Sequence, residues 1–464
     1  SLKFDAPNEL RVEVDNSHTP NSRWYTGSGI YRNVVLHVGN PVHVEVDGIQ
    51  VKTNSLNPIV IEVATRLSSE QAASVQVEVL DGETVLASGS GNPCTLEVPK
   101  ANPWSEKEPN LYDVHVRVFN DDNVLLDEST CRTGFRTLSW NDREGLLVNG
   151  KSVKLRGGCI HHDNGILGAA APAKAEYRKA KAMKDSGYNA IRSAHNPISK
   201  EMLNACDELG MFIMDETFDV WVVPKSSYDY SICFEQEWEK DCKAMIQKDF
   251  SHPSVILYSV GNEIGEAGNE TGYKINADLV DLFHKEDPTR PVTNALNPMA
   301  AMLTKMVNAS HDTSLSDVHD PYQKTEDEKG GGSQIFNNLM TLLPVVMKVV
   351  SRPTLVERTM HPVLEKLDII GLNYMESLYE PLRKKGEHRI FVGSETFPNG
   401  MAKRWTQVKK QPFNIGDFCW TAVDYLGEVG VGVPVYGSST AKFNQPYPCI
   451  TGGCGTLDLL CEPN

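Results

Sequence analysis

Hydrophobic residues follow two different periods along the chain, and the period changes near Gly134. Between residues 39 and 134, apolar and polar residues alternate, most clearly at 42–46, 60–63, 75–79 and 114–118. Turn signals such as Asp81-Gly82 and Pro109-Asn110 separate these segments. Short alternating strands at this spacing are typical of an antiparallel β-sandwich. We therefore predict an immunoglobulin-like β-sandwich over residues 39–134.

From residue 135 onward, short apolar runs alternate with amphipathic patterns. For example, Met202, Cys206 and Leu209 lie at i, i+4 and i+7, and Gly210 follows as a helix-terminating residue. Strands that alternate with helices predict a parallel sheet. The predicted strands lie at 153–156, 190–193, 211–215, 255–260, 290–295, 367–372, 390–393 and 416–421. Eight strands with interleaved helices predict a (β/α)8 TIM barrel over residues 135–464, and hence a multidomain chain.

Two of these predicted strands lead into a glutamate. The run at 255–260 continues into Gly261-Asn262-Glu263, and the run at 390–393 continues into Ser394-Glu395. Ligands bind at the carboxyl ends of parallel strands, so both acids are expected to face one cleft. A pair of carboxylates is the minimum needed to hydrolyse a glycosidic bond. Either glutamate alone is equally well explained as the cap of the next helix, but the pair favours catalysis.

The Gly-Asn-Glu run at 261–263, Glu395 after a second strand and the His-Asn-Pro run at 195–197 resemble glycoside hydrolase family 2. This is the family of β-galactosidases, β-glucuronidases and β-mannosidases, and the resemblance extends along almost the entire chain. It implies that Glu263 is the general acid/base and that Glu395 is the nucleophile. It also implies that Asn262 hydrogen-bonds the sugar 2-hydroxyl. The stretches 161–168 and 215–221 look most like a bacterial β-galactosidase branch.

Polar and aromatic residues follow several other predicted strands, as expected for a sugar-binding cleft. Histidines can donate hydrogen bonds to sugar hydroxyls, Asp219 can accept them, and Trp221 can offer its face to a pyranose. Tyr374 is expected to hydrogen-bond Glu395, and Trp420 to form the floor of the pocket. Structural histidines and a core position for Trp420 are the alternatives. The candidate sugar contacts are His161, His162, Asp163, His195, Asn196, Asp219, Trp221, Tyr374 and Trp420.

The resemblance also implies how the two ends of the chain are organised. Residues 1–38 resemble the end of an N-terminal jelly-roll domain whose loop leans into the active site. Arg23 is therefore a candidate sugar contact, with an ordinary loop residue as the alternative. No closing helix follows the eighth predicted strand, so we expect a fragment at both ends and a barrel that lacks its last helix. Residues 297–365 exceed a normal crossover and are predicted to contain a mobile loop.

The composition of the chain limits the classes of partner and the compartments that we expect for it. The net charge of −16 argues against nucleic acid or an anionic membrane. No apolar run reaches the roughly 20 residues needed to span a bilayer. The 10 cysteines are scattered without a zinc-binding spacing, which indicates a reducing compartment. We expect a cytoplasmic protein, with a periplasmic or secreted location as the alternative.

We expect no cofactor and no required metal. Many bacterial β-galactosidases of the family that the chain resembles carry Glu and His ligands for magnesium after strand three, where this chain has residues 217–221. The pairs His311-Asp312 and His319-Asp320 are interpreted as solvated loop residues.

These features together predict a retaining exo-β-glycosidase that hydrolyses terminal non-reducing β-D-galactose residues. The expected partner is a carbohydrate, a β-galactoside, and a homo-oligomer is left open. The alternatives are a β-glucuronidase or β-mannosidase on the same scaffold, and an inactive carbohydrate-binding fragment. A metal-dependent barrel hydrolase is a further alternative, for which only residues 161–164 offer clustered ligands.

Overall fold

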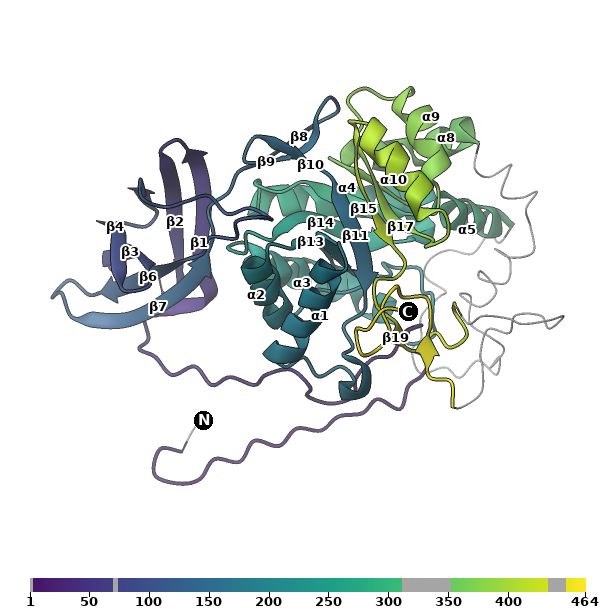
Figure 1. Cartoon of the computed structure of the whole chain (residues 1–464). Coiled ribbons are helices and arrows are strands. Elements are labelled where there is room, and N and C mark those ends of the chain that lie inside the picture. Colours follow the sequence, from purple (N-terminus) through teal and green to yellow (C-terminus); the bar gives the residue numbers. More distant parts are fainter. Residues whose placement is uncertain (1–2, 70–73, 311–351, 433–447) are drawn as a thin grey trace.

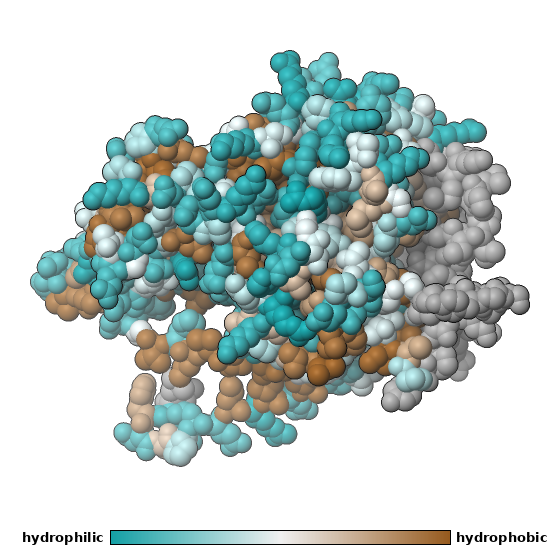
Figure 2. All heavy atoms as spheres, viewed as in Figure 1, coloured by the Kyte–Doolittle hydropathy of each residue, from teal (hydrophilic) through white to brown (hydrophobic). Residues whose placement is uncertain are grey.

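The structure is a computed structural model that describes residues 3–69, 74–310, 352–432 and 448–464 (Figure 1). Most of the insertion predicted at 297–365, including both His-Asp pairs, lies outside these residues. Residues 3–40 form an extended segment, and many of its apolar side chains, including those of Phe4 and Val38, are exposed. Figure 2 shows apolar side chains along the outer surface of this segment. Near its middle this segment is held by hydrogen bonds from the Tyr25 N–H to the Leu426 carbonyl (3.1 Å) and from the Glu428 N–H to the Arg23 carbonyl (3.2 Å).

Two antiparallel sheets form the N-terminal part of the molecule, as the alternating pattern predicts. One sheet has the order β1 (Val44–Leu56), β2 (Ile59–Leu67), β5 (Cys94–Glu97). The other has the order β4 (Thr84–Ser90), β3 (Ser74–Asp81), β6 (Tyr112–Phe119), β7 (Leu125–Thr133). Along β6 every second side chain is buried, because successive side chains of a strand point to opposite faces. The alternate residues of these strands share one hydrophobic core.

Eight parallel strands then close into a barrel, which confirms the predicted fold class. The strands are β11 (Leu155–Ile160), β12 (Ala190–Ser193), β13 (Phe212–Glu216), β14 (Val255–Asn262), β15 (Val292–Leu296), β16 (Ile370–Asn373), β17 (Phe391–Thr396) and β18 (Asn414–Cys419). Pairing of β11 with β18 completes the ring. Every residue of β14 and of β17 is buried, as expected for strands that are covered on both faces.

The first barrel strand begins later than predicted. Val153 belongs to β10 (Lys151–Val153), which pairs with β9 (Gly145–Val148). On its other side β9 pairs with β8 (Leu138–Asn141), and the three strands form a separate small sheet. The barrel strand β11 instead contains Gly157 and Gly158, which weaken a strand signal in the sequence. A Cβ atom on Gly157 would lie 2.2 Å from the Phe418 ring, so close packing against β18 explains this glycine.

Helices cover the outside of the barrel. They are α1 (Ala173–Asp185), α2 (Lys200–Leu209), α3 (Phe234–Asp249), α4 (Glu270–Glu286), α5 (Pro298–Ser310), α8 (Pro353–Lys366), α9 (Tyr379–Arg383) and α10 (Met401–Lys410). Short 3-10 helices occur at η1 (Gly165–Leu167), η2 (Tyr230–Ile232), η3 (Gly265–Gly268) and η5 (Glu376–Leu378). The predicted end of α2 at Gly210 is confirmed, with φ of 68° at that glycine.

After β18, the described residues form only the two-stranded pair of β19 (Tyr425–Leu426) and β20 (Thr451–Gly452). Within the described ranges, no helix has the length and apolar character needed to cross a membrane.

Candidate active site

The structure brings the two predicted glutamates together at the carboxyl ends of β14 and β17. The side-chain nitrogen of Asn373 donates to Glu263 Oε1 at 3.3 Å and to Glu395 Oε2 at 3.2 Å. Because both contacts end on one nitrogen atom, the two oxygens are no further apart than the sum of these distances. The two carboxylate oxygens are thus at most about 6.5 Å apart. In inverting glycosidases the carboxyl groups are about 6.5–9.5 Å apart, so the separation here lies at or below the lower end of that range.

Glu395 is held by two further donors. Arg192 Nη1 donates to its Oε2 at 2.8 Å, and the Tyr374 hydroxyl donates to its Oε1, as the sequence predicts. Burial and the nearby Glu263 carboxylate raise the pKa of Glu395 to about 7, although Arg192 and Tyr374 favour its charged form. A carboxyl group beside a second carboxylate is harder to ionise, so Glu395 holds its proton more tightly than a free carboxyl group does.

The two carboxylates have different neighbours. Glu263 accepts hydrogen bonds from the neutral amides of Asn297 (2.8 Å) and Asn373. Glu395 accepts from the Arg192 guanidinium, which stabilises an ionised carboxylate more strongly than a neutral donor does. The guanidinium contact therefore favours charge on Glu395, and no comparable cationic donor contacts Glu263 among the described residues.

Arg192 is the centre of a buried network that the sequence analysis missed. Its side chain is fully buried, and it bonds both oxygens of Glu216, with Nη2 at 2.9 Å from Oε1 and Nε at 3.1 Å from Oε2. Its Nη2 also donates to Asn262 Oδ1 at 2.8 Å. A charged residue inside the predicted strand 190–193 was the available signal, because a buried charge needs a partner.

A second network orients Asn262 from the other side. The amide of Asn262 donates to Asp219 Oδ1 at 2.9 Å, and Arg23 binds both oxygens of Asp219 at 2.6 and 3.1 Å. Lys225 bonds Asp219 at 2.9 Å and the Asn262 carbonyl at 2.8 Å. Burial raises the pKa of Asp219, but Arg23 and Lys225 outweigh burial and hold it well below its usual range. Arg23, from the N-terminal segment, therefore reaches Asp219 beside Asn262, and its contact with a sugar stays a prediction.

Three of the predicted residues form an aromatic wall beside these networks. His195 Nδ1 is hydrogen-bonded to Glu216 Oε1 at 2.9 Å, and the His195 ring stacks on Trp420 with centroids 5.3 Å apart. The buried His161 ring lies against Trp24, 5.1 Å away, and edge-on to Trp420. Both ring nitrogens of His161 have no hydrogen-bond partner among the described residues. Burial lowers the pKa of His161, so its ring is neutral and able to bind a hydroxyl group.

Four predicted contacts lie elsewhere. Trp221 is fully buried in the barrel core, where its indole donates to the Val260 carbonyl at 3.0 Å, so it offers no face to a sugar. The side chain of Asp163 accepts from the N–H of Gly165, and that of Asn196 donates to the carbonyl of Pro197. The ring of His162 lies 6.3 Å from that of Tyr31 in the N-terminal segment. None of these four bonds either catalytic candidate within the described part of the chain.

One group of side chains in the described residues has the spacing of metal ligands, and it lies outside the site. Glu357, His361 and Glu365 follow one another on α8 with ligand atoms within 4.8 Å. Both glutamates are already paired with Arg389. This group is therefore interpreted as an ion-pair cluster on the outside of the barrel.

Two family models match the chain. Residues 141–338 match "Glycosyl hydrolases family 2, TIM barrel domain", and residues 40–136 match "Glycosyl hydrolases family 2". The β-galactosidase BoGH2A of Bacteroides ovatus is 38% identical over 345 residues, which are 64% of this chain and 40% of that protein. A putative β-glucuronidase of Formosa agariphila is 30% identical over 444 residues, 91% of this chain and 41% of that protein.

Solved structures share the fold. A crystal structure of a glycosyl hydrolase family 2 member from Bacteroides cellulosilyticus superposes with a TM-score of 0.78 at 32% identity. The match covers 96% of this chain and 52% of that one. The chain therefore spans about half the length of this structure and less of the two curated relatives.

Proposed function

Because the chain belongs to glycosyl hydrolases family 2, we propose that it is a retaining exo-β-glycosidase for terminal non-reducing β-D-galactose residues. The observation that carries this proposal is the amide of Asn373, which contacts the carboxylates of Glu263 and Glu395 at once. A separation limited in this way suits a nucleophile and an acid/base that act on one anomeric carbon.

In the first step, Glu263 gives its proton to the glycosidic oxygen as the bond from that oxygen to the anomeric carbon breaks. The ionised Glu395 forms a bond to the same carbon, which yields a covalent glycosyl-enzyme and releases the aglycone as an alcohol. Arg192 and Tyr374 keep Glu395 ionised and aimed for this attack.

In the second step, the now ionised Glu263 takes a proton from water as the water oxygen bonds to the anomeric carbon. Glu395 leaves as a carboxylate, and two inversions give net retention of configuration. Asn262 is fixed by Arg192 on its oxygen and by Asp219 on its nitrogen, which prepares its amide to hydrogen-bond the sugar 2-hydroxyl.

The pairing of the cations supports a neutral sugar over a uronic acid. Arg192 is bound by Glu216 and Glu395, while Arg23 and Lys225 share Asp219. Arg192, Arg23 and Lys225 are thus each already paired with a carboxylate. The 38% identity to a β-galactosidase points the same way, whereas the putative β-glucuronidase relative keeps glucuronide hydrolysis as the second candidate.

The test is a panel of 4-nitrophenyl β-glycosides offered to the full-length protein. We expect turnover of the galactoside, little turnover of the glucuronide and mannoside, and loss of turnover in Glu263→Gln and Glu395→Gln. Proton NMR of the first product should show β-galactose. Preference for the glucuronide would overturn the sugar assignment, and initial release of α-galactose would overturn the mechanism.

A further inference from the structure

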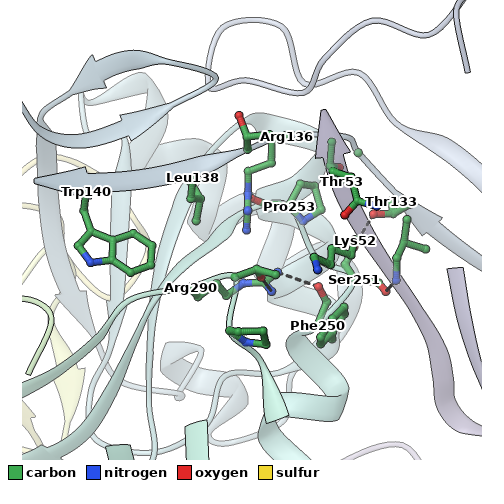
Figure 3. Close-up of a pocket in the computed structure, with 16 residues that line it drawn as sticks. Lys52, Thr53, Thr133, Arg136, Leu138, Trp140, Phe250, Ser251, Pro253 and Arg290 are labelled. Carbon is green, nitrogen blue, oxygen red and sulfur yellow. Dashed lines mark hydrogen bonds between the residues drawn. The ribbon is translucent and has the colours of Figure 1, made fainter. Parts of the chain in front are cut away.

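A cavity of about 310 Å³ lies between the β-sandwich and the base of the barrel (Figure 3). Thr53 of β1 lines one side, and Phe250 and Pro253, just before β14, line another. Glu263 follows the opposite end of β14, an eight-residue strand that spans roughly 25 Å at about 3.3 Å per residue. The cavity is therefore separate from the proposed active site, and its function does not rest on the proposed reaction.

The walls of this cavity carry positive charge. Its 16 lining residues include Lys52, Arg136 and Arg290 but no aspartate or glutamate. The whole chain has a net charge of −16, so this local excess of cations runs against the overall composition. A concave site lined by one sign of charge attracts ligands of the opposite sign.

Two of the three cations lack a counterion. Arg290 is paired with Asp287 at 2.5 Å, and all three of its guanidinium nitrogens are hydrogen-bonded. Arg136 uses Nε and Nη2 on the carbonyls of Pro253 (2.8 Å) and Val255 (2.6 Å). Its Nη1 has no partner among the described residues, and Lys52 likewise makes no ion pair with any of them.

The position of Arg136 is electrostatically unfavourable as it stands. The side chain is buried, only 8% exposed, and Figure 3 shows its guanidinium directed toward that of Arg290. Burial and the positive charge of Arg290 lower the pKa of Arg136 to about 9. A bound anion would supply the counterion that the described residues do not provide.

The same cavity has an apolar side. Leu138 and the half-buried Trp140 line it next to Arg136, as Figure 3 shows. An aromatic face beside positively charged donors suits a compact molecule with a polar ring and one anionic group. The volume is at the lower end of the range for small-molecule sites, about 300–1,000 Å³.

We propose that this cavity binds a small oxyanion-bearing molecule of monosaccharide size. Its phosphate or carboxylate group is held by Arg136 Nη1 and Lys52 Nζ, and its body packs on Leu138 and Trp140.

The proposal is tested by calorimetry and thermal unfolding of the full-length protein with glucose 6-phosphate, glucuronate, inorganic phosphate and glucose. We expect saturable binding of at least one oxyanion and a rise in Tm, because a ligand that binds only the folded state stabilises it. Neutral glucose should give no comparable effect at the same concentration. Comparing the affinities for glucose 6-phosphate, inorganic phosphate and glucuronate shows whether the cavity prefers a sugar phosphate, free phosphate or a sugar carboxylate.

Amino-acid substitutions test whether the oxyanion binds in this cavity. Lys52→Glu should abolish oxyanion binding, and Lys52→Gln should weaken it about tenfold, as expected for loss of a charged hydrogen bond. Lys100→Gln changes an exposed lysine outside the cavity and is the matched control. Arg136→Lys tests the guanidinium, with Tm in buffer reporting whether the variant folds. Absence of oxyanion binding, equal binding of glucose, or unchanged affinity in Lys52→Glu would overturn the proposal.

Discussion

Replacing Tyr374 by Phe deletes one hydroxyl group from the carboxylate that we propose as the nucleophile. That hydroxyl donates to Glu395, while the Tyr374 ring stacks on Phe397 with centroids 4.3 Å apart. The ring packing survives the substitution, so the change isolates the hydrogen bond. Burial and Glu263 already raise the pKa of Glu395 to about 7, and Tyr374 is one of the groups that oppose this rise.

The size of the effect follows from this one contact. A hydrogen bond to a charged group contributes about 1.5–3 kcal/mol. Since about 1.4 kcal/mol corresponds to one pKa unit, its loss should raise the pKa of Glu395 by about one to two units. Only the ionised carboxylate attacks, so kcat/KM at neutral pH should fall about 5- to 50-fold, and the acidic limb of its pH profile should move to higher pH by the same interval.

The assay is kcat/KM for 4-nitrophenyl β-D-galactoside over the pH range in which the enzyme is stable. Tyr188→Phe is the matched control, because it removes a hydroxyl that bonds Thr456 at 2.8 Å, away from both carboxylates. An acidic limb that stays in place in Tyr374→Phe, or that moves equally in Tyr188→Phe, would refute the reasoning.

Three further predictions concern stability and the outer network. Because the pKa of Glu395 is raised in the folded state, this group contributes stability below about pH 4.5, and that contribution is lost as pH rises through about 7. Glu395→Gln should therefore have a higher Tm than the parent at neutral pH. This gain in Tm should shrink at acidic pH. An equal Tm difference at both pH values would contradict this. Arg23→Gln should lower kcat/KM about 10- to 100-fold, because it removes the charged hydrogen bonds to Asp219. The Tm should fall little, because Arg23 lies on the N-terminal segment. Unchanged kcat/KM would count against a role for this network. Gly157→Ala should lower Tm by several degrees, because its new methyl group would overlap the Phe418 ring, and an unchanged melting curve would show that β18 can yield.

Particular residues show how far prediction from sequence reached. The strand-end glutamates were predicted because position at the end of a parallel strand is a local property. The strands continue slightly beyond the predicted runs, so Glu263 follows β14 directly and Glu395 lies one residue before the end of β17. Tyr374 was predicted to meet Glu395, and the structure has that contact. Arg192 and Glu216 were missed because a charged residue in a strand looks the same in sequence whether its partner lies across the barrel or in solvent.

The two tryptophans make the same point about packing. Trp221 follows one predicted strand, Trp420 lies near the end of another, and both were expected at the sugar site. Trp420 stacks on His195 at the site, whereas Trp221 turns into the core beneath Gly261. The direction of a side chain after a strand depends on what already fills the space around it, and neighbours distant in sequence decide that.

The sequence by itself determined the order of sandwich and barrel and the strand ends that carry the acids, because the period of apolar residues is set by local backbone geometry. Only the tertiary structure decided which groups lie beside those acids. The Arg192 network, the entry of Arg23 and the cation-lined cavity each join segments more than 60 residues apart, and closure of the barrel brings them together.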